Sequence, residues 1–393
     1  MNLNIRKEKA NDLCLLACIY VWIFSSVLFG RTTIESALGA VSHYIYQFGR
    51  YAVYAALAAS ILCCNRPDKR MHFWCVVVTA AVLAVSVLFS REVVLISILL
   101  FTCAARNVRP RRIVMTYFAA HLSVVAITLL LCLFGDIDPN VMHRGSVIRR
   151  TFGFNHPNAF GGELCVLSYC YLYLRGMALT YKEIIAGYVI TVVLYLLTDC
   201  RTAFMVLMLI LTCVLVLKYF GTERLAKYLP GVAYTVLGIV VFAGLFFSFF
   251  DNDKIPLLNK LDQIFSYRFD CMYDSFKQLG VSLFGTRAKE TTMLDNSFVR
   301  VFFVNGAVTF VILVAFCGLT THCFSKSKNV ILLLTWCAFI LMGFMENTLF
   351  RVEYNWAFLV AGSMLLSGEE QTNERFSQWL KRMVPNGNPL LRE

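Results

Sequence analysis

The sequence predicts an all-α, polytopic integral membrane protein with about twelve transmembrane helices and one long outward loop that carries an amphipathic helix. Of 393 residues, 59% are hydrophobic and only 15% are charged, and the mean hydropathy is +0.66. This composition excludes an ordinary soluble protein. The apolar residues fall in separate runs near the length of about 20 residues that a membrane-crossing helix needs. Basic residues gather in alternate loops between these runs.

Twelve apolar runs are expected to cross the membrane, some of them short or tilted. In chain order they are 13–29, 44–64, 73–89, 93–105, 113–134, 159–174, 184–197, 202–217, 231–250, 298–319, 330–345 and 354–366. The first is expected to be a span and not a cleaved signal peptide, because it lacks a small-residue cleavage site.

The orientation follows from the basic loops 66–70, 106–112, 218–227 and 326–328. The positive-inside rule places these loops and both termini in the cytoplasm. Membrane-flanking Lys and Arg then explain most of the net charge of +12, without nucleic-acid binding. Without internal repeats, residues 1–368 are expected to form one membrane domain, followed by a cytoplasmic tail, 369–393.

The polar segment 149–162 between the fifth and sixth spans carries the clearest functional signal. Arg149 and Arg150 can bind phosphate, because a guanidinium donates two parallel hydrogen bonds. Asn155 and Asn158 can bond sugar hydroxyls. The proline before Asn158 predicts an extended turn and then a helix, whose first N–H groups would face an anion. Alternatively, the segment is a capped helix start with two interfacial arginines.

This segment resembles the signature of O-antigen and capsular or exopolysaccharide repeat-unit polymerases, and of the related O-antigen ligases. In that signature ten residues separate an arginine from a glycine, as they do for Arg150 and Gly161. The turn 198–202 resembles the second arginine-bearing turn of the family. It contains Arg201, with Cys200 in place of the usual serine. An Asp199–Arg201 pair that caps two helices is the alternative for this turn.

The long outward loop, about 251–294, has apolar residues at three- and four-residue steps from Leu261 to Leu283. This spacing predicts an amphipathic helix that lies at the outer interface. Arg268, together with the sequence Ser-Leu-Phe-Gly at 282–285, resembles the large external loop of the family. The apolar stripe is expected to pack against the protein, although a polyprenyl chain would need such a surface.

A third resemblance lies at 295–306, where Asp295, Asn296 and Arg300 precede Asn-Gly. In ligases the polar pair commonly begins with histidine, so Asp295 is a departure that weakens a ligase assignment. Asp295 could instead cap the helix. Glu346 lies beside Asn347 at the outward end of a span and is a secondary candidate, since an acid near an interfacial arginine is more often structural.

The resemblance implies polymerisation of undecaprenyl-diphosphate-linked oligosaccharides, both donor and acceptor, on the outer face of the bacterial cytoplasmic membrane. The arginines would stabilise the leaving diphosphate without a cofactor. No metal site is expected, because no cluster of metal-ligand type is evident on the outward face. His156, Asp295 or Glu346 would take the hydroxyl proton. A flippase and a chain-length regulator are implied partners, while a ligase or a lipid-linked oligosaccharide flippase are alternative functions.

Overall fold

The computed structural model describes residues 2–64, 70–288 and 294–366. The expected tail at 369–393 lies outside these ranges. The longer helices are α1 (Asn2–Leu28), α3 (Ala40–Cys64), α4 (Arg70–Ser90), α6 (Pro110–Phe134), α7 (Pro157–Arg175), α8 (Tyr181–Thr198), α9 (Arg201–Phe220), α11 (Leu229–Phe249), α15 (Ala307–Lys326) and α16 (Val330–Met345).

The other helices are shorter. They are α2 (Ile34–Leu38), α5 (Val94–Ala104), α10 (Thr222–Ala226), α12 (Pro256–Ile264), α13 (Arg268–Leu279), α14 (Ser297–Arg300) and α17 (Ala357–Leu365), with 3₁₀ turns at Gly176–Ala178 and Asn252–Lys254 and a π-helical turn at Val301–Asn305. Two four-residue strands, β1 (Val141–Arg144) and β2 (Val147–Arg150), form a hairpin.

Seven helices in the described ranges are long and apolar enough to cross a membrane: α1, α4, α6, α8, α9, α11 and α15. The predicted all-α, multi-pass membrane protein is therefore confirmed in its class. Each of the twelve predicted spans overlaps a helix, but α5, α16 and α17 have only 11, 16 and 9 residues. These lengths fall short of a straight crossing, so length and composition alone identify fewer spans than the sequence predicts.

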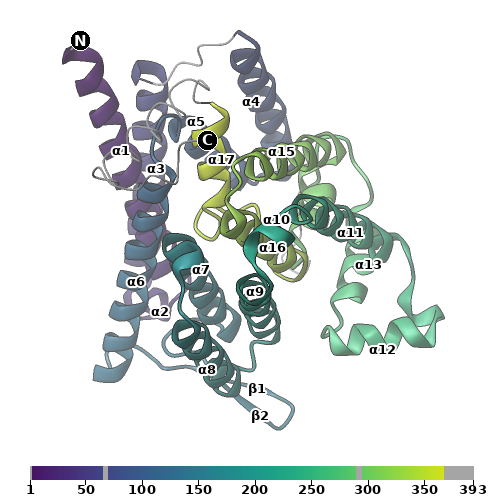
Figure 1. Ribbon diagram of the computed structural model, residues 1–393. Helices are drawn as coiled ribbons and strands as arrows, with labels where there is room; N and C mark the ends of the chain where they lie inside the picture. The colour runs from purple at the N-terminus through teal and green to yellow at the C-terminus, as the bar shows by residue number, and fades with distance from the viewer. Residues whose placement is uncertain (1, 65–69, 289–293, 367–393) are drawn as a thin grey trace.

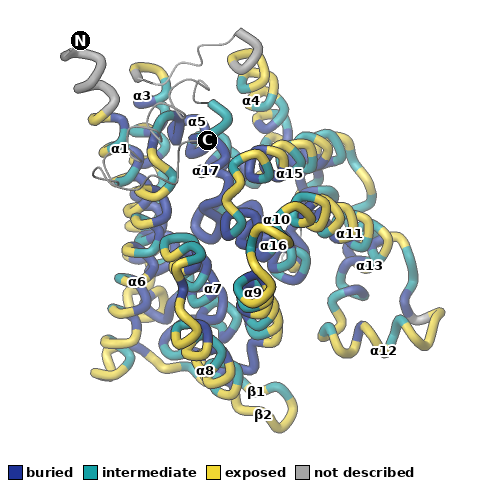
Figure 2. Tube along the Cα trace, in the orientation of Figure 1, coloured by how far each residue is buried: buried dark blue, intermediate teal, exposed yellow. Residues whose placement is uncertain are grey.

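The centre of the bundle is formed by α5, α16 and α17, which are mostly buried (Figure 2). Outer helices such as α4, α8 and α11 carry exposed large apolar side chains, for example Ile190 and Phe242. Contiguous apolar surface of this extent is rare on soluble monomers and suits contact with lipid chains. A lipid bilayer is thus the environment that this surface requires.

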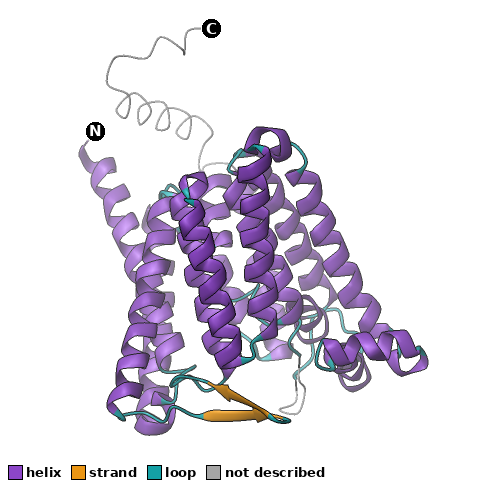
Figure 3. Ribbon diagram, turned by 60° about the horizontal axis from the view of Figure 1, so that its bottom comes forward, coloured by secondary structure: helices purple, strands orange, loops and turns teal. Residues whose placement is uncertain are grey.

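The β1–β2 hairpin lies across one end of the bundle, away from the N-terminus (Figure 3). Figure 1 places α12 toward the same end. The strands pair antiparallel with Met142 opposite Arg149 and Arg144 opposite Val147, and Gly145 turns the chain with a φ of +59°. The sequence analysis did not predict this hairpin, since four-residue strands are too short for a period-two pattern to stand out.

The long loop holds two helices, so the single predicted amphipathic helix is wrong in this detail. The helix breaks between α12 and α13, where Ser266 and Tyr267 have positive φ values of 61° and 58°. The carboxylate of Asp262, which is 1% exposed, accepts hydrogen bonds from the N–H groups of Phe269 (2.7 Å) and Asp270 (3.2 Å). These bonds satisfy the free N–H groups of α13 and stabilise the break.

The predicted tenth span is likewise broken, because α14 and the π turn end at Gly306 and α15 begins after it. At this break the loop 282–286 crosses the helix backbone: the N–H groups of Ala307 and Val308 donate to the carbonyls of Ser282 and Leu283. A Cβ on Gly306, whose φ is +94°, would lie 2.5 Å from the nitrogen of Gly285. Only glycine fits this crossing of two backbones.

Candidate functional site

The polar segment 149–162 begins α7 as predicted, since the helix starts at Pro157 with His156 as its N-cap. The Nδ1 atom of His156 accepts a hydrogen bond from the N–H of Asn158 at 3.0 Å. Gly161, one turn into the helix, packs against α9, and a Cβ there would lie 2.5 Å from the Sγ of Cys200. Gly161 therefore brings two helices together and does not itself contact a ligand cavity beside His156.

Arg149 and Arg150 lie on opposite faces of the hairpin, because successive strand residues alternate. Arg149 is 4% exposed, whereas Arg150 is exposed. The two neighbouring guanidiniums therefore have different surroundings, and their binding of phosphate stays a prediction. Arg149 is an anchor: its Nε donates to the carbonyl of Thr198 at 2.9 Å, and its terminal nitrogen donates to Oδ1 of Asn158 at 2.8 Å.

Arg144 shares the hairpin face of Arg149 and was missed by the sequence analysis. It donates to Oδ2 of Asp199 at 3.0 Å, and Nε of Arg201 lies 3.6 Å from Oδ1 of the same carboxylate. Asp199 ends α8 in the left-handed conformation, with a φ of 45°. The Asp199–Arg201 pair thus exists, but Asp199 also orients Arg144. The only signal for Arg144 in the sequence is its position beside the hairpin turn, and this position can be recognised only once the strand pairing is known.

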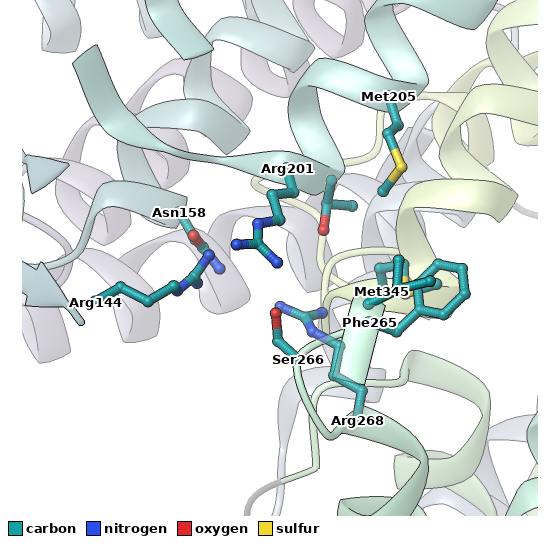
Figure 4. Close-up of a pocket in the computed structure, with 10 residues that line it drawn as sticks. Arg144, Asn158, Arg201, Met205, Phe265, Ser266, Arg268 and Met345 are labelled. Carbon is teal, nitrogen blue, oxygen red and sulfur yellow. The ribbon is translucent and has the colours of Figure 1, made fainter. Parts of the chain in front are cut away.

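Arg144, Arg201 and Arg268 come together from β1, α9 and α13 around one small pocket, here called the arginine pocket (Figure 4). None of its ten lining residues is Asp or Glu. The side chains of Phe265, Met205 and Met345 form its other side (Figure 4). Three forked cations beside an apolar wall form a surface that suits an anion attached to a lipid.

Glu346, at the C-terminal end of α16, links this pocket to α7. Its Oε1 accepts hydrogen bonds from Arg268 at 2.7 Å and from Nδ2 of Asn158 at 2.9 Å. Asp295 lies 3.6 Å from the same terminal nitrogen of Arg268, and its side chain is 56% exposed. The other terminal nitrogen of Arg268 is buried without a hydrogen-bond partner among the described residues. Arg268 thus keeps donors for a further group.

A larger cavity of about 480 Å³ adjoins the arginine pocket, and Asn158 lines both. The charged or polar residues on its wall are Arg31, His156, Asn158, Asp295, Arg300, Glu346, Asn347, Thr348, Arg351 and Tyr354. Hydrogen-bonding groups on several walls of a cavity this size suit a sugar. His156, Asn158, Arg201 and Asp295, from three separately predicted regions, therefore line this pair of cavities, whereas Arg150 lines neither.

Burial sets the protonation of two groups that face the large cavity. Burial, reinforced by Arg149, lowers the pKa of His156 below its ordinary value of 6.5. A neutral imidazole that accepts at Nδ1 must carry its proton on Nε2, so His156 presents a donor. Burial raises the pKa of Glu346 above its ordinary value of 4.5, although Arg268 opposes this shift. Because Nδ1 of His156 already accepts a hydrogen bond from Asn158, Glu346 is the group of the two with an acceptor atom free for a proton.

Other predicted residues have different surroundings. Asn296 is 1% exposed, and its Oδ1 caps α14 by accepting from the N–H groups of Phe298 and Val299. The suggested cap at Asp295 is thus wrong by one residue. Arg300 lines the large cavity but forms an ion pair with Glu92. Asn155 is exposed at the turn before α7.

Arg31 and Arg351 also line the large cavity and were not among the predicted site residues. Arg31 follows α1, and the backbone there is joined to the turn before α7: Asn155 N–H donates to the carbonyl of Arg31 at 3.0 Å, and Thr33 N–H donates to that of Gly153 at 2.9 Å. These contacts join residues more than 100 positions apart, so no local pattern could have revealed them.

Within the described ranges, no group of three or more His, Cys, Asp or Glu residues is placed to hold a metal ion. No family model, curated protein or solved structure matches the chain.

Proposed function

We propose that this protein is a membrane glycosyltransferase that polymerises lipid-diphosphate-linked oligosaccharides. One observation carries the proposal: three arginines from separate elements surround a pocket without lining acids, and Asn158 joins that pocket to a polar cavity of about 480 Å³. The resemblance of segment 149–162 to the repeat-unit polymerases supports the same function. The substrate would be an undecaprenyl-diphosphate-linked repeat unit.

In this proposal the diphosphate of the donor lies against the three arginines at the mouth of the arginine pocket, whose own volume is only about 20 Å³. A hydroxyl oxygen of the acceptor sugar attacks the anomeric carbon of the donor and forms the new C–O bond. The bond between that carbon and the diphosphate oxygen breaks, and the diphosphate leaves with the electron pair. Arg144, Arg201 and Arg268 stabilise the negative charge that grows on the leaving oxygen, since guanidiniums are fixed there before the reaction starts.

Glu346 is the proposed base that takes the hydroxyl proton. Its Oε1 already accepts two hydrogen bonds, which fixes the carboxylate and leaves Oε2 for the acceptor. The raised pKa makes this carboxylate a stronger base than an exposed glutamate. His156, which presents Nε2–H, would bind a sugar oxygen, and Asp295 would bind a hydroxyl at the open side of the cavity.

The membrane arrangement is also part of the proposal. With twelve crossings, the short helices α5, α16 and α17 would be tilted or partly embedded crossings among longer neighbours, and both cavities would face outward. The positive-inside pattern of the loops supports this orientation. The membrane would then be the bacterial cytoplasmic membrane, with both termini inside.

A lipid-linked oligosaccharide flippase is the second candidate, favoured by one buried pair. Nδ1 of His121 in α6 lies 2.5 Å from Oε2 of Glu163 in α7, and both side chains are 0% exposed. Ionisable pairs inside membrane bundles often serve transport. A flippase should carry charges deep within several helices, whereas Arg144, Arg201 and Arg268 lie at the ends of β1, α9 and α13, so we favour the enzyme.

The test is to supply the purified protein in vesicles with a lipid-diphosphate-linked repeat unit and to separate the products by mass. A polymerase yields a ladder that grows by whole repeats and releases undecaprenyl diphosphate. A ligase needs a different acceptor, and a flippase moves the lipid without changing its mass. Translocation without any new glycosidic bond would refute the proposed function.

A further inference from the structure

Arg31 has no direct ion-pair partner among the described residues, and the carboxylates of Glu353 and Glu163 act on its charge only from a longer distance. None of the hydrogen bonds or ion pairs among the described residues uses its guanidinium, which lies 6.0 Å from the centre of the Tyr354 ring. The other two arginines on the wall of the large cavity are paired, Arg300 with Glu92 and Arg351 with Glu353. A guanidinium whose N–H groups have no direct acceptor keeps its five donors for a ligand.

Arg351 stands beside Arg31 on two cavities. Both residues line the large cavity, and both line a second cavity of about 210 Å³, here called the side cavity, whose wall also includes Glu35 and Glu353. One terminal nitrogen of Arg351 donates a hydrogen bond to Oε1 of Glu353 at 3.3 Å. A guanidinium has five N–H donors, so this pair orients Arg351 and leaves donors for another anion.

The arginine pocket, the large cavity and the side cavity therefore adjoin one another in that order. The arginine pocket meets the large cavity at Asn158, and the large cavity meets the side cavity at Arg31 and Arg351. Neither Arg31 nor Arg351 lines the arginine pocket. Two groups of arginines are thus separated by the cavity in which the sugars would react.

Polymerisation joins two substrates of one chemical kind, and each carries its own diphosphate. We infer that Arg31 and Arg351 bind the diphosphate of the acceptor, while the arginine pocket binds that of the donor. This inference rests on the proposed function. The acceptor glycan would extend from the junction through the large cavity to Glu346.

The experiment separates the two substrates chemically. The donor is a lipid-diphosphate-linked repeat unit whose reactive terminal hydroxyl is methylated, so it cannot accept. One acceptor is the same repeat unit on its lipid diphosphate, with the anomeric oxygen replaced by CH₂ so that it cannot donate. The other acceptor is the free oligosaccharide. The measured quantity is kcat/KM for each acceptor.

For Arg31→Gln we expect kcat/KM with the lipid-linked acceptor to fall about 10- to 100-fold, the effect of losing charge-assisted hydrogen bonds. Transfer to the free oligosaccharide should stay unchanged, which also shows that the variant is folded. Arg91→Gln is the matched control, since Arg91 is exposed near the same cavities and lines neither of these two. It should alter neither acceptor.

An equal change with both acceptors, or no change with either, would overturn the inference. If Arg31→Gln does not accumulate in the membrane, Arg351→Gln provides the same comparison at the other side of the junction. Failure of the proposed function has a different result, because the unaltered protein would then form no glycosidic bond with either acceptor.

Discussion

Replacing Arg149 by alanine should damage the fold of the site, whereas replacing Arg150 should not. Arg149 is 4% exposed, and its guanidinium makes two short hydrogen bonds, to the carbonyl of Thr198 and to Asn158. Hydrogen bonds to charged groups contribute about 1.5–3 kcal/mol each, so Arg149→Ala should cost roughly 3–6 kcal/mol. Exposed Arg150→Ala should change stability by less than about 0.5 kcal/mol.

The assay is the thermal midpoint of unfolding of both variants in one detergent. At roughly 2 °C per kcal/mol for a large domain, Arg149→Ala should lower the midpoint by about 6–12 °C. Arg150→Ala should stay within about 1 °C of the unaltered protein. If the Arg150 variant fell as far as the Arg149 variant, the strand register that places these side chains on opposite faces would be wrong.

The other predictions concern the base, the helix contact, the orientation and the metal. Because burial raises the pKa of Glu346 above 4.5, the transfer rate should fall as pH falls through a range above the ordinary carboxyl value. Protonation of Glu346 also favours the folded state. If the thermal midpoint of unfolding does not fall over the same pH range, unfolding is excluded as the cause of the lower rate. Gly161→Ala should destabilise by about 1–3 kcal/mol through overlap with α9, while Gly238→Ala, where a Cβ meets nothing within 4 Å, should be neutral or stabilising in the same melting assay. In a background without native thiols, a cysteine at Lys260 should react with an impermeant reagent in intact cells, and one at Arg109 only after permeabilisation; the reverse pattern would invert the topology. Chelators should leave the polymer ladder unchanged, and strict dependence on a divalent ion would contradict the arginine mechanism.

The helices could be predicted because membrane-compatible runs are local and long. The sequence analysis placed the start of α7 within one residue, since a proline restricts the backbone of the residue before it and itself suits the first position of a helix. Hydropathy could not reveal the breaks. The break before Arg268 depends on Asp262, and the break at Gly306 depends on a loop that crosses the helix.

The site could be predicted only in part, because its members come from distant segments. His156 and Asn158 stand in a recognisable motif, and both line the large cavity. Arg144 and Arg31 carry no local signal, since the first depends on strand register and the second on a bridge between Thr32 and Phe154. The sequence also does not distinguish Arg149 from Arg150, although alternation along the strand buries one side chain and exposes the other.

The crossing of the two backbone segments at Gly285 and Gly306 can also help to identify related proteins. A Cβ on Gly306 would lie 2.5 Å from the nitrogen of Gly285, and a Cβ on Gly285 would lie 2.5 Å from the carbonyl oxygen of Val304, so each segment's backbone excludes a side chain on the other. A related protein that keeps this arrangement must keep both glycines, and one that loses the crossing is free to replace both. A pair of glycines about twenty positions apart, before and inside a late apolar run, is therefore a search criterion for distant homologues that overall similarity does not detect.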